Sequence, residues 1–364
     1  MQTAVPPQAI EAANATCLWE DPGMLACSAR RRASLALAAV LLALLAQADG
    51  VALPGSTQPA IGATGGQELT APALGTAPGT YAVGTLTLRL VDPRRTIHLR
   101  GDRTEPRTLV TSVRYPALAA ATGANAVAAP APGPFPLVVF AHGYDVTPAT
   151  YAGLLASWTR AGYVVAAPLF PLTNAHAPGG PDEADVVNQP ADVSFVISSL
   201  LAASTGTSAS ATPLRGLIDP LRIAVAGQSD GAETALAVAD SRRERDARVS
   251  AALILSGAEL SGIGGYSFAP GGPALLAAQG TDDVFNEPRF TYAYFRDARR
   301  PKYLLRLLGA GHLPPYTTEQ PQLAIVERVT RAFLDGYLKG SASARSELAP
   351  FGTVTGAAAL LSEP

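Results

Sequence analysis

The residues of this chain with the clearest potential for chemistry surround Ser229. This serine lies in a Gly-Gln-Ser-Asp-Gly motif at 227–231, directly after the apolar run Ala224–Ala226 and before the helix-prone run Ala232–Asp240. A serine between a strand and a helix lies on a sharp turn that exposes its hydroxyl group. Glycines two residues before and after it allow the strand and the helix to pass close together. The pattern therefore predicts a nucleophilic serine.

A serine nucleophile needs a base to take its proton. The chain has four histidines, namely His98, His142, His176 and His312. His312 follows the last strand that we predict, in the sequence Gly-Ala-Gly-His. Ligands of open α/β sheets bind at the carboxyl ends of the strands, so His312 should reach the same edge as Ser229. We therefore expect His312 to be the base, rather than a histidine of a surface loop.

The acid that orients this histidine should follow the preceding strand. Two adjacent aspartates, Asp282 and Asp283, come directly after the run Ala274–Gln279 and a Gly-Thr turn. An ionised carboxylate would hold the imidazole in the required tautomer and stabilise the imidazolium. Adjacent residues of an extended turn point in different directions, so only one of the two can reach His312. If neither does, Glu259 beyond the strand before it is the remaining candidate.

Two backbone N–H groups should stabilise the negative charge that develops on the attacked oxygen. One is expected from Asp230, which follows the nucleophile at the start of its helix. The other is expected from Tyr144, in a loop after a buried strand where Gly143 allows close approach. His142 has a possible catalytic role, but a histidine before this glycine more often supports the loop by hydrogen bonding.

The order of apolar runs predicts the elements that position these residues. We expect strands over Tyr81–Val91, Thr108–Tyr115, Phe135–Ala141, Tyr163–Ala167, Ile223–Ala226, Ala251–Leu255, Ala274–Gln279 and Tyr303–Leu308. We expect helices over Pro148–Ala161, Asp185–Ala202, Ala232–Asp240 and Gln320–Leu338, and turns at Asp92-Pro93 and Gly101-Asp102. This alternation predicts an α/β fold with a mostly parallel sheet of about eight strands, helices on both faces and no large cap.

The N-terminal region has the features of an export signal. Arg30–Arg32 precede the uncharged apolar run Ala33–Ala46, and small residues at 46 and 48 suit a cleavage site after Ala48. We therefore expect a secreted or periplasmic protein. The predicted division is a signal peptide with its leader over 1–48, a flexible linker over 49–80, a catalytic domain over 81–340 and a C-terminal tail over 341–364.

Composition excludes several classes of partner. The net charge of −2 gives no basic field for nucleic acid, and the apolar run before the cleavage site is too short to span a membrane comfortably. Both cysteines, Cys17 and Cys27, precede the proposed cleavage site, so the processed chain has no disulfide. His176 lies near Asp182 and Glu183 without the fixed spacing of metal ligands. We expect a monomer with no metal and no cofactor.

With these residues placed, the chain resembles the α/β-hydrolase superfamily from about Tyr81 to Leu338. Four segments resemble the branch that contains chlorophyllases, platelet-activating-factor acetylhydrolase-like enzymes and cutinase-type polyester hydrolases. They are Arg107–Pro116, Val139–Tyr144, Gly162–Pro168 and Asn188–Val196. The resemblance implies a triad of Ser229, Asp283 and His312, and it favours Asp283 over Asp282. It implies oxyanion amides at Tyr144 and Asp230, and it places Gln228 in the substrate cleft, where relatives often have His or Trp.

These expectations favour a secreted serine esterase that acts through an acyl-enzyme. An aromatic side chain at Tyr144 and an open site would suit bulky or polymeric esters, as in cutinase-type enzymes. A lipid- or chlorophyllase-like esterase, and a peptidase or acyltransferase on the same triad, remain alternatives. An inactive binding module is a further one, although the intact acid, base and nucleophile argue against it.

Overall fold

The computed structural model describes residues 80–99, 102–118, 122–129, 133–206 and 212–364. The predicted signal peptide, nearly all of the predicted linker and both cysteines lie outside the described residues. The strands are β1 Ala82–Leu99, β2 Arg103–Ala117, β3 Gly123–Ala124, β4 Phe135–Ala141, β5 Val164–Leu169, β6 Ile218–Gln228, β7 Val249–Leu255, β8 Ala274–Gly280, β9 Lys302–Leu307 and β10 Ala358–Glu363. The α-helices are α2 Ala152–Arg160, α3 Gln189–Ser204, α4 Asp230–Asp240, α5 Pro288–Asp297, α6 Gln322–Tyr337 and α7 Ala342–Gly352. Short 3₁₀ helices are η1 Pro148–Tyr151, η2 Glu183–Asn188, η3 Thr212–Leu214 and η4 Pro314–Tyr316.

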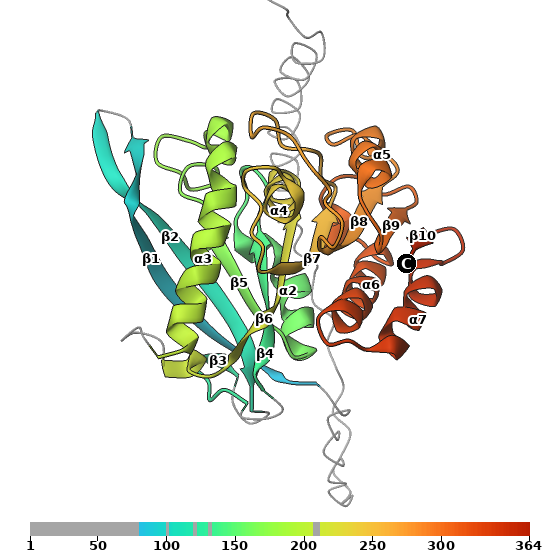
Figure 1. The fold of residues 1–364 in the computed structure, drawn as a ribbon, viewed down its shortest axis with the longest axis horizontal. Helices are drawn as coiled ribbons and strands as arrows, with labels where there is room; N and C mark the ends of the chain where they lie inside the picture. Colours follow the sequence, from blue (N-terminus) through green and yellow to red (C-terminus); the bar gives the residue numbers. More distant parts are fainter. Residues whose placement is uncertain (1–79, 100–101, 119–121, 130–132, 207–211) are drawn as a thin grey trace, which may run out of the picture. The chain divides into compact units, whose positions relative to one another are not determined.

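The described strands form one mixed sheet in the order β10-β9-β8-β7-β6-β4-β5-β2-β1-β3 (Figure 1). Strands β5, β4, β6, β7, β8 and β9 are parallel neighbours, whereas β2 and β10 join this group antiparallel at either side. The chain goes from β4 to β5 on one side and to β6 on the other. The strand order therefore reverses at β4, and such a switch point opens a crevice at the carboxyl ends of the strands.

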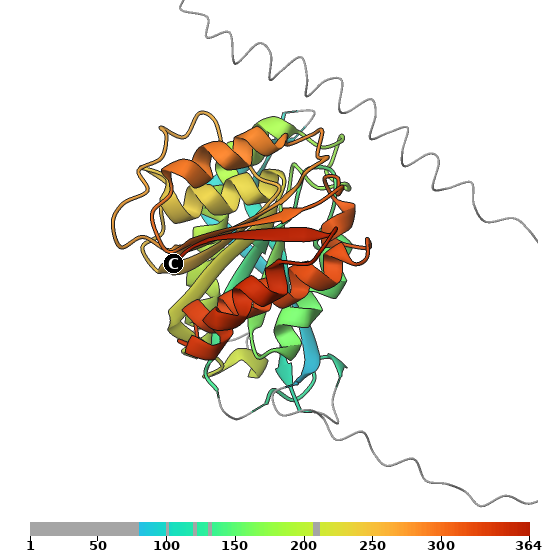
Figure 2. The same cartoon turned by 90° about the vertical axis from the view of Figure 1, so that its right-hand side faces the viewer.

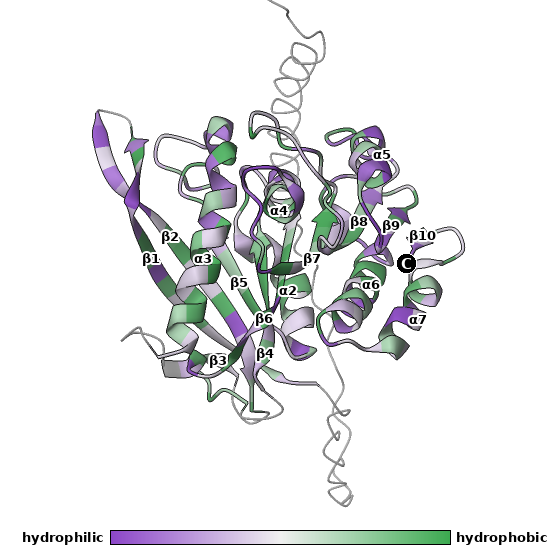
Figure 3. Ribbon diagram, viewed as in Figure 1, coloured by the Kyte–Doolittle hydropathy of each residue, from purple (hydrophilic) through white to green (hydrophobic). Residues whose placement is uncertain are grey.

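Helices cover both faces of the sheet, as Figures 1 and 2 show. Helices α3, α4 and α5 contribute buried residues to one hydrophobic cluster, and α2, α6 and α7 contribute to the other. The central strands are mostly apolar because both of their faces are covered, although β6 is polar near its start, whereas the far end of the β1–β2 hairpin is hydrophilic (Figure 3). The predicted α/β fold with a mostly parallel sheet is confirmed.

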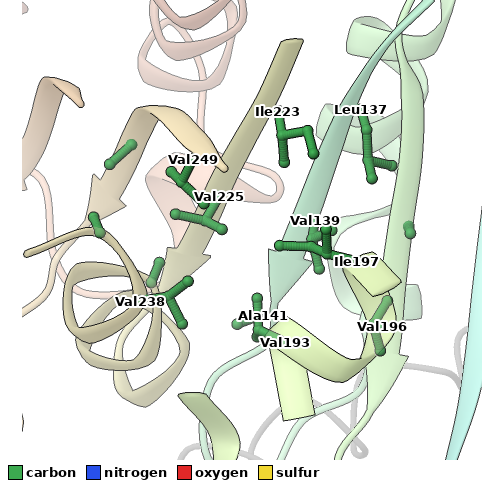
Figure 4. Close-up of a cluster of buried hydrophobic side chains, with 14 of the residues drawn as sticks. Leu137, Val139, Ala141, Val193, Val196, Ile197, Ile223, Val225, Val238 and Val249 are labelled. Carbon is green, nitrogen blue, oxygen red and sulfur yellow. The ribbon is translucent and has the colours of Figure 1, made fainter. Parts of the chain in front are cut away.

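The core between the sheet and α3 packs aliphatic side chains of the strands against the helix (Figure 4). The cluster includes Leu137 and Val139 of β4 and Val225 of β6, all fully buried. Val196 and Ile197 of α3 cover them. Each such side chain contributes about 1.5–3 kcal/mol when it leaves water. This packing fixes the ends of β4 and β6 relative to each other, and with them the loops that follow.

The helical stretch Glu183–Ser204 is the one part of the described chain that is long and apolar enough to cross a membrane by length and composition. Its apolar residues, such as Val193 and Leu200, are buried in the core. One of its three acidic residues, Asp192, is also buried, and it accepts hydrogen bonds of 2.6 Å from the Nε and Nη2 atoms of Arg107 on β2. These contacts are those of a helix that packs on the sheet.

The predicted turn at Asp92-Pro93 is wrong, because β1 runs through these residues. The strand continues to Leu99, and its pairing with β2 shifts between Asp92–Arg107 and Thr96–Pro106. The extra residues of β1 form a bulge, in which the backbone N–H of Arg94 donates to the Asp92 carboxylate at 3.0 Å. A bulge accommodates proline because no ladder hydrogen bond is required from it.

The C-terminal segment corrects the predicted tail over 341–364. Helix α7 begins after Ser341, whose hydroxyl accepts a hydrogen bond from the N–H of Ala344 at 3.1 Å. Strand β10 then pairs antiparallel with β9 along its whole length. The two elements contact each other where Gly352 lies against Leu360. The segment therefore extends the sheet, which has ten described strands rather than about eight.

Candidate active site

Ser229 occupies the sharp turn between β6 and α4, with φ of 58° and ψ of −128°. Both glycines of the motif are required by contact with backbone. A Cβ atom on Gly227 would lie 2.0 Å from the carbonyl oxygen of Gly231, and one on Gly231 would lie 2.1 Å from that of Ala141. Any larger residue would push α4 away from β6 or from the end of β4. The predicted turn is therefore present, and it exposes part of the serine.

The three residues of the predicted triad lie in hydrogen-bond contact at the carboxyl ends of three strands. The Oγ of Ser229 is 2.8 Å from Nε2 of His312, and Nδ1 of His312 is 2.8 Å from Oδ2 of Asp283. The side chain of Asp283 is fully buried, whereas that of His312 keeps 15% of its surface exposed. The aspartate holds Nδ1 as a donor, which leaves Nε2 as the acceptor that faces the serine hydroxyl.

The carboxylate of Asp283 is surrounded by donors. Oδ1 accepts from the backbone N–H groups of Phe285 and Asn286, at 2.9 and 3.0 Å. Oδ2 also lies 3.2 Å from Nε2 of Gln279, a buried side chain of β8. The sequence analysis missed Gln279 and Asn286, because a glutamine at the end of a buried strand gives no sign of its partner. These donors fix the orientation of the carboxylate toward the histidine.

The other acidic candidates lie outside this contact. Asp282 is exposed, and its Oδ1 accepts a hydrogen bond from the hydroxyl of Thr281 at 3.0 Å. The backbone N–H of Asp282 donates to the carbonyl of Ala310 at 3.0 Å. This bond links the loop after β8, the acid loop, to the loop after β9, the histidine loop. Glu259 is also exposed. The geometry therefore agrees with the choice of Asp283 over both.

The loop after β4 lies against the nucleophile. A Cβ atom on Gly143 would be 3.2 Å from the Cβ of Ser229, so this glycine gives the loop its close approach. Tyr144 follows, and its hydroxyl donates to the carbonyl of Pro181 at 3.0 Å. The ring is half-buried rather than exposed, and burial raises the pKa of its hydroxyl, with a further contribution from the carboxylate of Glu183. The predicted donor Asp230 is the first residue of α4, where N–H groups point out of the helix end.

His142 supports this loop and is fully buried. Its Nδ1 donates to the carbonyl of Gly143 at 2.7 Å, and its Nε2 accepts from the N–H of Phe170 at 3.1 Å. An acceptor role for Nε2 requires the neutral ring, and burial lowers the pKa of His142 to about 4. The histidine thus ties the loop after β4 to the loop after β5, as predicted for a supporting role.

Gln228 is not in a cleft, which contradicts the predicted contact with substrate. Its side chain is buried, with 1% of the residue exposed. The Oε1 atom accepts from the hydroxyl of Tyr151 at 2.7 Å, and Nε2 donates to the backbone carbonyl of His312 at 3.0 Å. The residue before the nucleophile points into the protein here because it alternates with Ser229 at the end of the strand.

The remaining histidines have local roles. His98 is exposed and lies 3.2 Å through Nδ1 from the hydroxyl of Thr104. His176 is exposed, whereas Asp182 accepts a hydrogen bond from the N–H of Ala184 at the start of η2. Among the described residues, no group of three or more His, Cys, Asp or Glu side chains is placed to hold a metal ion.

The burial of His142 predicts a loss of stability in acid. Its pKa rises from about 4 in the folded protein to the ordinary 6.5 on unfolding, so the unfolded chain binds the proton first as the pH falls. This contribution to the free energy of unfolding is complete above pH 6.5 and is lost toward pH 4, by up to about 3 kcal/mol. Urea unfolding across this range should show a weaker pH dependence for His142→Gln.

The matched control for this measurement is His98→Gln, which removes an exposed histidine and should keep the steep dependence of the unchanged protein. Parallel stability curves for His142→Gln and the unchanged protein would mean that His142 does not titrate on unfolding.

Similarities of this chain to known proteins concern its family and its fold. Residues 101–258 match the family model described as Chlorophyllase. The structure is similar to that of a ferulic acid esterase from Streptomyces cinnamoneus, with a TM-score of 0.55 and 23% sequence identity. This similarity covers 76% of this chain and 94% of the esterase chain. A search of curated proteins gave no significant match. The structural likeness shows the α/β-hydrolase fold, and the family match makes residues 101–258 similar to the chlorophyllase branch of these esterases.

Proposed function

We propose that the chain cleaves carboxylic esters through an acyl-enzyme on Ser229. The observation that carries this proposal is the continuous set of contacts from Ser229 through His312 to the buried carboxylate of Asp283, each 2.8 Å long. Serine alone is a weak nucleophile, and a neighbouring base whose orientation is fixed makes it reactive. The contacts have the geometry that this activation requires before any substrate binds.

In the first half of the reaction, Oγ of Ser229 attacks the acyl carbon of the ester while its proton passes to Nε2 of His312. The tetrahedral intermediate then collapses, the bond to the alcohol oxygen breaks, and the alcohol leaves with the proton from His312. Asp283 stays ionised and stabilises the imidazolium throughout. The acyl group remains on the serine as an ester.

The negative charge of the tetrahedral intermediate needs donors close to Ser229. We assign them to the backbone N–H groups of Tyr144 and Asp230, on the loop after β4 and at the start of α4. Support comes from the tight contacts of Gly143 with the serine and of Gly231 with the end of β4, which bring both segments to the nucleophile. One such donor is typically worth a factor of about 10²–10³ in kcat.

The second half repeats the chemistry with water as the nucleophile. His312 takes a proton from water, the resulting hydroxide attacks the acyl carbon, and the proton then returns to Oγ of Ser229 as the carboxylic acid leaves. The partial exposure of His312 is consistent with access of water to Nε2. This step distinguishes hydrolysis from transfer of the acyl group to another alcohol.

We propose bulky or aromatic esters, including polymeric ones, as the substrate class. The acid loop presents apolar surface beside the histidine, where Val284 is 69% and Phe285 is 39% exposed. The ring of Phe285 lies 5.3 Å from that of His312, centroid to centroid. The esterase to which the structure is similar is named for ferulic acid, an aromatic acid. An exposed aromatic ring at the reacting centre would pack against such a group.

Export of the protein is a further part of this proposal. It is supported by the three arginines at 30–32, the apolar run Ala33–Ala46 and the small residues before Asp49. N-terminal sequencing of protein recovered from outside the cytoplasm should give Asp49 as the first residue. Secreted protein that begins before Arg30 would contradict processing at this site.

The substitution Ser229→Ala tests the proposed function directly. We expect it to lower kcat for ester hydrolysis about 10⁴-fold or more, because serine, histidine and acid act as one unit, while the protein stays folded. Turnover should be measured on p-nitrophenyl esters of increasing chain length, methyl ferulate, a polyester film and a peptide anilide. Activity on the anilide alone would favour a peptidase, and labelling of a different serine by an organophosphate would move the nucleophile elsewhere.

The adjacent aspartates provide a matched pair for the acid. We expect Asp283→Asn to lower kcat by about 10⁴-fold, since the buried amide would no longer orient His312 in the required tautomer. Asp282→Asn makes the same change of charge on an exposed side chain and should lower kcat far less. Steady-state kinetics of both variants on one ester decide the assignment. Greater damage from Asp282→Asn would reverse it.

A further inference from the structure

Gln228 and Tyr151 connect two loops of the proposed active site. Gln228 is the last residue of β6, directly before the nucleophile, and its Nε2 donates to the backbone carbonyl of His312 at 3.0 Å. Its Oε1 accepts from the hydroxyl of Tyr151 at 2.7 Å, and the same hydroxyl accepts from the backbone N–H of Gly143 at 3.3 Å. A single chain of hydrogen bonds therefore runs from the loop after β4, here the oxyanion loop, to the histidine loop.

The orientation of this amide is determined by its partners. The carbonyl of His312 can only accept, so the amide nitrogen of Gln228 must face it. The hydroxyl of Tyr151 already accepts from Gly143, and its own proton needs the amide oxygen. The reverse orientation would place two acceptors together at His312 and leave the proton of Tyr151 without an acceptor. The chain of bonds thus requires a side chain with one donor and one acceptor.

Both side chains are out of reach of a substrate. Tyr151 is fully buried, and its ring packs against Phe140 with 4.7 Å between the centroids. Gln228 has 1% of its surface exposed. Burial also raises the pKa of the Tyr151 hydroxyl, which therefore stays protonated as a donor. The two residues can influence the reaction only through the loops that they connect.

We propose that Gln228 and Tyr151 are positioning residues that hold the His312 backbone at a fixed distance from the oxyanion loop. The proposal rests on the proposed function of Ser229 and His312. In the structure Nε2 of His312 lies 2.8 Å from Oγ of Ser229, and the backbone carbonyl of His312 accepts a hydrogen bond from Gln228. Loss of the anchor lets the histidine loop shift relative to the serine, and small shifts at a reacting centre lower kcat strongly.

Three variants test the pair. Gln228→Leu and Tyr151→Phe each remove their part of the chain of bonds, and the double variant removes both. We expect each single change to lower kcat by about tenfold to a hundredfold. KM should change little, and the fold-decrease in kcat should be the same for short and long p-nitrophenyl esters. The double variant should be no worse than Gln228→Leu, because residues that act through one network are not additive.

A fourth variant gives a signature that simple destabilisation cannot produce. In Gln228→Glu, the protonated carboxyl has one donor and one acceptor and matches the amide, whereas the ionised carboxylate faces the carbonyl of His312 with like polarity. The ratio of kcat in Gln228→Glu to kcat in the unchanged enzyme should therefore fall as the pH rises. The corresponding ratio for Gln228→Leu should not depend on pH.

The control is Thr330→Val, which removes another buried hydroxyl, the acceptor of a 2.9 Å hydrogen bond from Nε1 of Trp158. It should lower Tm without changing kcat. The positioning role is wrong if Gln228→Leu leaves kcat unchanged or if the effects of the two substitutions are additive in the double variant. It is also wrong if the ratio of KM in the variant to KM in the unchanged enzyme depends on acyl chain length. If the unchanged protein cleaves no ester, the proposed function fails. The rate of organophosphate labelling at Ser229 then decides on the pair, with slower labelling in both single variants as the expected result.

Discussion

The site depends on one steric constraint, the close passage of three backbone segments at Ser229. Strand β6, the first turn of α4 and the end of β4 approach so closely that no Cβ atom fits at Gly227 or Gly231. The serine between them takes a backbone conformation that costs a residue with a side chain about 1–3 kcal/mol. The buried strands and helices on either side leave it no alternative. The same contact brings the loop after β4 next to the nucleophile.

The acid and the histidine are held by a second contact between chain segments. A Cβ atom on Gly280 would lie 2.4 Å from the carbonyl oxygens of Ala310 and Gly311, so the end of β8 touches the loop after β9. Asp283 and His312 come shortly after these residues in the sequence, so the contact places them side by side. The donors around the carboxylate of Asp283 come from the acid loop and from β8. The positions of the reacting groups thus follow from parallel strands that end at the same level, rather than from the loops alone.

The sequence predicted the elements whose residues are buried on both faces and failed where burial is partial. Strand β4 was predicted with its observed bounds, because an unbroken apolar run between turn residues has few other structures. Helix α5 was missed, since only Thr291, Tyr294 and Phe295 of its ten residues are buried. Strand β10 was taken for part of a tail, because its mostly half-buried and exposed residues show no alternation. Such elements are determined by what they pack against, which local sequence does not contain.

The same distinction separates the reacting residues from those that hold them. Ser229, Asp283 and His312 were predicted because the chemistry restricts their types and the fold restricts their order. Gln279 and Tyr151 were not predicted, and Gln228 was wrongly assigned to the substrate cleft, because a buried amide or hydroxyl can pair with any neighbouring polar group. Burial keeps His142 neutral at ordinary pH, with a pKa of about 4, and raises the pKa of Tyr151. These supporting hydrogen bonds therefore keep their donors and acceptors while a proton moves between Ser229 and His312. The loops that they hold keep their positions during the reaction.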